Sequence, residues 1–79
     1  MDDEELLARI GHLVAEEHAL ESQPGHALTD DEKARLRALE IALDQTWDLL
    51  HQRRARRRAG MDPDVATERP AAQVEGYQQ

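Results

Sequence analysis

Residues 21–32, which read ESQPGHALTDDE, decide the fold because they end one helix and begin another. Pro24 and Gly25 cannot continue a helix and together favour a turn. The TDDE that follows is a helix start, in which Thr29 is the N-cap and Glu32, three residues later, completes a capping box. This stretch therefore predicts two helices joined by about eight residues, which fold back on each other as an antiparallel hairpin.

The two helices that flank this break are expected at residues 3–21 and 30–58. Apolar residues recur at intervals of three and four in both, which places them on one face of each helix. When the helices are laid antiparallel, Leu13 meets Leu43 and Leu6 meets Leu50, and Gly60 is the expected end of the second helix. The predicted hairpin core comprises Leu6, Ile10, Leu13, Leu20, Leu36, Leu39, Leu43, Trp47 and Leu50, and Thr46 shares the seam position with Trp47.

Residues 61–79 show no sustained periodicity and contain Pro, Ala and Gln. We expect a mostly irregular, flexible tail, in which Val74 and Tyr77 are the only obvious apolar anchors. The predicted fold class is thus all-α, with a hairpin over residues 1–60 and a tail after it.

A second stripe on the 30–58 helix lies roughly opposite the hairpin seam and comprises Ala34, Ala38, Ile41 and Leu49. A hairpin needs only one of these two faces, and a hydrophobic core in a chain of this size rarely supplies more than about 3–5 kcal/mol. We therefore expect self-association, most simply of two hairpins into a four-helix bundle. The alternative is that these alanines only favour helix formation.

Five arginines, Arg53, Arg54, Arg56, Arg57 and Arg58, fall within six residues of a chain whose net charge is −7. The hairpin brings Arg53 and Arg54 near the acidic residues 2–5, at the negative end of the second helix dipole, while residues 56–58 extend beyond the first helix and are expected to be free. The run can also serve an anionic partner, either an acidic protein or the phosphates of a nucleic acid. A pI of 4.9 and the lack of interleaved aromatics argue against nucleic acid.

Candidates for catalysis or metal binding are weak. His12 and Glu16 stand four residues apart, but a convincing third ligand is missing. Glu17 occupies a seam position and could be a functional acid; the favoured interpretation is that it lies at the rim of the seam or pairs with a base such as Arg35 or Arg37. Asp44 and Asp48, four residues apart, could be metal ligands on one helix face, but the favoured interpretation is a pair of solvated acids. Gln52 stands one turn beyond Asp48, so neither Lys nor Arg follows it at the fourth residue. We expect no enzyme activity, no cofactor, no catalytic residue and no metal site.

The composition also restricts the setting. The chain has no Cys, which excludes disulfides and thiolate-metal sites and is consistent with a reducing cytoplasm. Its apolar runs are too short for a membrane span, and MDDEE is unlike a signal peptide. We expect a cytoplasmic protein without a membrane partner.

The segments EEHAL, RLRALEIALDQTWDLLHQRRARRRAG, DPD and RP followed by VEGYQQ resemble a bacterial domain-of-unknown-function family, number 2630. The similarity covers nearly the whole chain, and LDQTWDLLHQRRA is its most specific part. It implies a small helical cytoplasmic protein and assigns no catalytic residue. The leading hypothesis is a non-enzymatic interaction protein that pairs with itself, most simply as a dimer, or with another protein; the alternative is a nucleic-acid-associated factor that uses residues 53–58.

Overall fold

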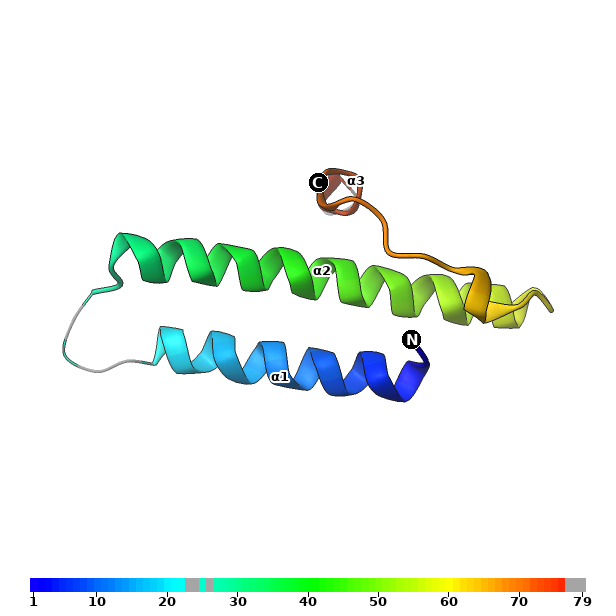
Figure 1. The fold of residues 1–79 in the computed structure, drawn as a ribbon, viewed down its shortest axis with the longest axis horizontal. Helices are drawn as coiled ribbons and strands as arrows, with labels where there is room; N and C mark the ends of the chain where they lie inside the picture. Colours follow the sequence, from blue (N-terminus) through cyan, green and yellow to red (C-terminus); the bar gives the residue numbers. More distant parts are fainter. Residues whose placement is uncertain (23–24, 26, 77–79) are drawn as a thin grey trace.

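A computed structural model shows two long antiparallel helices and a tail that returns along the second of them (Figure 1). The structure describes residues 1–22, 25 and 27–76. Its elements are α1 (Asp3–Glu21), α2 (Asp30–Arg58), the 3₁₀ turn η1 (Pro63–Val65) and the short α3 (Ala71–Gly76). The predicted all-α hairpin is confirmed. Its shape is elongated, 51 × 25 × 16 Å, so most of its residues lie near solvent.

Both long helices begin at capping boxes. The Glu5 backbone N–H donates to Asp2 Oδ1 at 2.8 Å, and the Asp2 N–H donates to Glu5 Oε1 at 3.2 Å. At α2 the Glu32 N–H donates to Thr29 Oγ1 at 3.1 Å, and the Thr29 N–H donates to Glu32 Oε1 at 2.9 Å. Four backbone donors that the helix ends would otherwise leave unpaired are satisfied in this way.

Gly60 ends α2 in the left-handed conformation, with φ of 74°. The Met61 N–H donates to the Arg56 carbonyl at 2.7 Å, and the Gly60 N–H donates to the Arg57 carbonyl at 3.2 Å. This pair of bonds is the Schellman arrangement, in which glycine takes a backbone geometry that other residues adopt only with strain. It turns the chain back toward α2.

The hairpin core is small. Leu6, Ile10, Leu43 and Leu50 form one buried cluster, and Leu13, Val14 and Leu49 pack against it. Leu39 is also buried, whereas Leu20 and Leu36 are half-buried near the turn.

Trp47 does not belong to this core, so its assignment to the hairpin seam is wrong. The residue is 39% exposed, and the neighbouring Thr46, which is 2% exposed, occupies the seam position instead. The Thr46 hydroxyl donates to the Ala42 carbonyl at 2.7 Å, so the hydroxyl keeps a hydrogen-bond partner although it is buried. A small β-branched side chain thereby lets α1 approach closely and leaves the indole at the edge of the interface.

Candidate functional site

At the open end of the hairpin, Arg53 links the elements that meet there. The residue is only 5% exposed. Its Nε donates to Asp3 Oδ1 at 2.7 Å, and its Nη1 donates to Asp64 Oδ1 at 2.9 Å and to the Pro63 carbonyl at 3.3 Å. One guanidinium thus connects α1, α2 and η1. Because it is enclosed by its own chain, Arg53 is not available to an anionic partner, and that part of the prediction is corrected.

Arg57 shares the same carboxylate, with Nη1 2.9 Å from Asp3 Oδ2. The expectation that residues 56–58 are all free is therefore wrong for Arg57, because α1 begins far enough along α2 for Asp3 to reach it. Hydrogen bonds from Arg57 and Arg53 lower the pKa of Asp3 from 3.8 to about 2. Together with Arg54 and Arg58, Arg57 lines an open hollow of about 280 Å³ on the end of α2.

The tail lies along the side of α2 that faces away from α1 (Figure 1). Asp48 forms an ion pair with Arg69, whose Nε donates to Asp48 Oδ2 at 2.8 Å, and Gln52 Nε2 donates to both Asp48 Oδ2 and the Thr67 carbonyl. Arg69 and, to a smaller extent, Gln52 hold the pKa of Asp48 below its ordinary value. Val74, with 4% exposure, is the buried apolar contact of the tail.

The helical spacing within α2 gives no sign of this arrangement, because the partner of Asp48 lies outside that helix. The interpretation of Asp48 as a solvated acid is wrong, since its partner Arg69 lies 21 residues away. The other proposed tail anchor, Tyr77, lies outside the described residues.

The tail also occupies part of the face on which we expect self-association. Gln45, Asp48 and Gln52 continue the stripe of Ala34, Ala38 and Ile41, and all three bond to the tail. Leu49 packs against the hairpin core, and Ile41 is half-buried. Of the four predicted face residues, Ala34 and Ala38 are exposed, and the tail lies on the continuation of their stripe toward the C-terminal end of α2.

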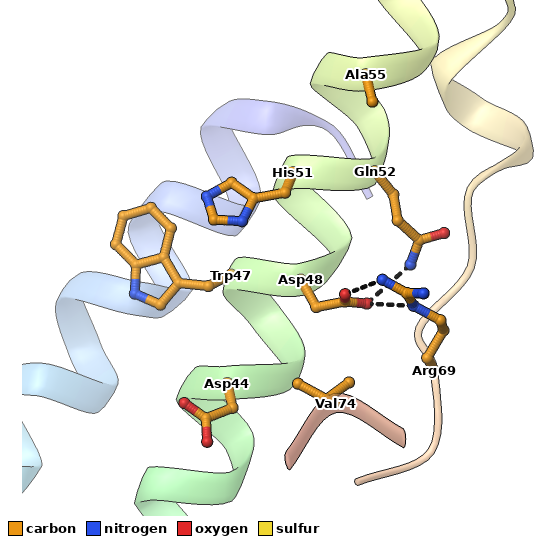
Figure 2. Close-up of a pocket in the computed structure, with 8 residues that line it drawn as sticks. All are labelled: Asp44, Trp47, Asp48, His51, Gln52, Ala55, Arg69 and Val74. Carbon is orange, nitrogen blue, oxygen red and sulfur yellow. Dashed lines mark hydrogen bonds and ion pairs between the residues drawn. The ribbon is translucent and has the colours of Figure 1, made fainter. Parts of the chain in front are cut away.

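A groove of about 450 Å³ runs along α2 between Trp47 and the tail (Figure 2). Trp47 and His51 form one side, with ring centroids 5.9 Å apart, and Arg69 and Val74 form the other. The remaining lining residues are Asp44, Asp48, Gln52 and Ala55. Its exposed indole and apolar lining make this groove the best-formed candidate for a binding surface.

Leu7 lies on the same flank of the hairpin as Trp47. Leu7 directly follows the buried seam residue Leu6 in α1, and Trp47 directly follows the buried seam residue Thr46 in α2. In an antiparallel helix pair, the residues that follow the seam positions of both helices lie on the same flank of the pair. Residues that precede the seam positions lie on the opposite flank. Glu16 and Arg35, which precede the seam positions 17 and 36, are an example, because they form an ion pair at 2.5 Å. With 45% of its surface exposed, Leu7 extends the apolar area beside the groove.

His12 and Glu16, the first pair considered for metal binding, gain no third ligand among the described residues. Within the described ranges, no three His, Asp, Glu or Cys side chains come together in a way that suits a metal ion. Glu16, the proposed companion of His12, is held by Arg35 instead, which also lowers the Glu16 pKa. Arg35, one of the two bases predicted to pair with Glu17, therefore pairs with Glu16 instead. The sequence also suggests His26, in the turn, as a neighbour of His18 and a weak metal candidate, but His26 falls outside the described residues.

The protein is thus a small helical hairpin whose tail is held against α2 by the ion pair between Asp48 and Arg69. The chain matches the family model described as a protein of unknown function, DUF2630, over residues 2–79, and it belongs to that family. It is 56% identical over 77 residues to the uncharacterized proteins Rv0898c of Mycobacterium tuberculosis and Mb0922c of Mycobacterium bovis, covering 95% of this chain and 88% of each relative. No solved structure gives a significant match. Among the described residues, no helix is both long and apolar enough to cross a membrane.

Proposed function

We propose that this chain is a non-enzymatic interaction protein that associates with a second helical hairpin, its own copy first, through the groove beside Trp47. The observation that carries this proposal is the exposed indole at the edge of an apolar groove. Large aromatic side chains contribute most when a partner buries them, and Trp is enriched among the residues that dominate binding energy. Leu7 adds apolar area on the same flank.

The small core supports the same proposal. Six of the described hydrophobic residues are buried: Leu6, Ile10, Leu39, Leu43, Leu50 and Val74. A core of this size gives a marginal monomer, and burying further apolar surface against a second chain adds stability. Pairing through an exposed helix flank is how two-helix units commonly complete a bundle.

Sedimentation equilibrium of three full-length proteins tests both the association and the face. We expect the wild type to form dimers as its concentration rises, Trp47→Gln to remain largely monomeric, and Ala38→Gln to behave as the wild type. Both substitutions are neutral and affect exposed positions, so circular dichroism should show intact helices. A monomeric wild type would refute self-association. Loss of dimer only in Ala38→Gln would assign the interface to the face of Ala34, Ala38 and Ile41.

A second candidate function is contact with phosphates of a nucleic acid or another polyanion. The observation that favours it is the hollow lined by Arg54, Arg57 and Arg58, in which Arg54 and Arg58 are exposed and one helical turn apart. Binding of labelled duplex DNA across a salt series tests it, with a slope of about −0.9 per phosphate contact. Arg54→Gln and Arg58→Gln should each flatten the slope, and a lack of binding at low salt would exclude this function.

A further inference from the structure

The flank of α2 that carries Trp47 has opposite charges on its two sides. Residues at alternating intervals of four and three form one stripe along the helix, and they are Glu40, Asp44, Trp47, His51, Arg54 and Arg58. The acids precede Trp47 and the bases follow it. Glu40 and Arg54 are exposed, and each is seven residues from Trp47, or about 10.5 Å along the axis.

We propose that two copies of the chain pair through this stripe as an antiparallel two-fold dimer centred on Trp47, with Glu40 of each copy facing Arg54 of the other. This inference rests on the proposed self-association and specifies its register. A two-fold axis makes every contact occur twice, so a surface must be complementary to itself. With Trp47 on the axis, the seven-residue offsets coincide: Glu40 faces Arg54, and Asp44 comes near His51.

A parallel arrangement in the same register would place Glu40 against Glu40 and Arg54 against Arg54. Such like-charge contacts are unfavourable, so the charge order selects the antiparallel dimer. Further from the axis, Arg37 approaches Arg58 of the other copy. Both are exposed arginines at the rim, where solvent screens the repulsion between long side chains.

Space around α2 is consistent with this arrangement. At 100° per residue, the Trp47 stripe lies about 100° from the seam that contacts α1, and about 100° from Gln45, Asp48 and Gln52 under the tail. The α1 helix, the second copy and the tail therefore approach α2 from three separate directions. The tail remains docked, and its Val74 and Arg69 form the wall of the groove that receives the second copy.

Charge reversal on full-length chains tests the register by sedimentation equilibrium. We expect Glu40→Arg to weaken dimerisation about tenfold, since two attractive contacts become repulsive. The control is Glu68→Arg, which makes the same charge change at an exposed residue of the tail. Glu40→Arg and Glu68→Arg both move the net charge from −7 to −5. A general charge effect would strengthen dimerisation equally in both, so weakening in Glu40→Arg alone identifies a local contact.

The decisive sample is an equimolar mixture of Glu40→Arg and Arg54→Glu. Each variant alone repels its own copy, but the mixed dimer restores both contacts. In one contact, the new arginine at position 40 of the first variant faces the new glutamate at position 54 of the second. In the other contact, the unchanged Arg54 of the first variant faces the unchanged Glu40 of the second. We expect the mixture to form a heterodimer of roughly wild-type affinity.

A mixture that stays monomeric, or a Glu40→Arg variant that dimerises like the wild type, would overturn this register. If Trp47→Gln still abolishes the dimer in that case, the proposed function stands and only the register falls.

Discussion

At the scale of single residues, Arg53 determines how the open end of the molecule is built. A guanidinium presents several fixed donors, so one side chain can satisfy a carboxylate on α1 and both a carboxylate and a carbonyl on η1. A lysine at this position would carry its three donors on one nitrogen, and so it could not reach acceptors as far apart as those that Nε and Nη1 of Arg53 bind. The arginine run thus contains residues with different tasks, and the buried one is structural.

Replacing Arg53 should therefore matter far more than replacing its exposed neighbour. We expect Arg53→Gln to lower the midpoint of thermal unfolding by at least about 5 °C, because it removes the charge and the fork that connect Asp3, Asp64 and Pro63. Arg54→Gln is the matched control, since it makes the same change on the solvent side of α2; because Arg54 also belongs to the proposed dimer contact, both variants are compared at a concentration where they are monomeric. Equal midpoints in the two variants, measured by circular dichroism at one protein concentration, would contradict a structural role for Arg53.

Acidification should destabilise the fold through the same cluster. The pKa of Asp3 falls from 3.8 to about 2 on folding, so the unfolded chain binds the proton more readily. The stabilisation is complete above about pH 3.8 and is lost as the pH falls toward 2, and the lowered pKa values of Glu16 and Asp48 act in the same direction. Urea unfolding should show this decline in the wild type and a shallower one in Asp3→Asn. Parallel pH profiles would contradict the assignment to Asp3.

At the scale of helices, the start of α2 is the strongest local signal. The reciprocal Thr29 and Glu32 bonds satisfy two backbone N–H groups at the turn. We expect Thr29→Ala to reduce the free energy of unfolding by about 1 kcal/mol. Thr67→Ala is the control, because only the backbone carbonyl of Thr67 is used by Gln52. A cost in urea unfolding no larger than that of Thr67→Ala would show that the box contributes little.

These elements also show what the sequence can and cannot predict. Capping residues and the three-and-four spacing are local signals, so the hairpin and the closeness of Arg53 to Asp3 could be predicted. The docking of the tail depends on Asp48 meeting Arg69 from 21 residues away, a contact without periodicity. The exposure of Trp47 could not be predicted, because the three-and-four spacing allows either residue 46 or residue 47 to occupy the seam. The hydrogen bond from Thr46 to the Ala42 carbonyl, which lets the hydroxyl be buried, is visible only in the structure. The groove follows from both of these, and so it could not be predicted.

At the scale of the molecule, a net charge of −7 opposes any pairing of two copies. The proposed dimer must overcome this long-range repulsion with contacts confined to one flank. Salt acts on the two effects differently, because the Debye length falls from about 30 Å at 0.01 M to about 8 Å at 0.15 M. The longer value exceeds the 25 Å width of the hairpin, whereas the shorter one still allows contact between facing side chains.

We therefore expect dimerisation to strengthen as salt rises from about 0.01 M to about 0.15 M, because whole-molecule repulsion is screened before the central contacts are. Glu68→Arg, which reduces the net charge without touching the stripe, should show a smaller gain over the same range. Sedimentation equilibrium at fixed protein concentration measures both. Dimerisation that weakens steadily from the lowest salt would mean that attraction between charged groups, and not the burial of Trp47 and Leu7, supplies most of the binding energy.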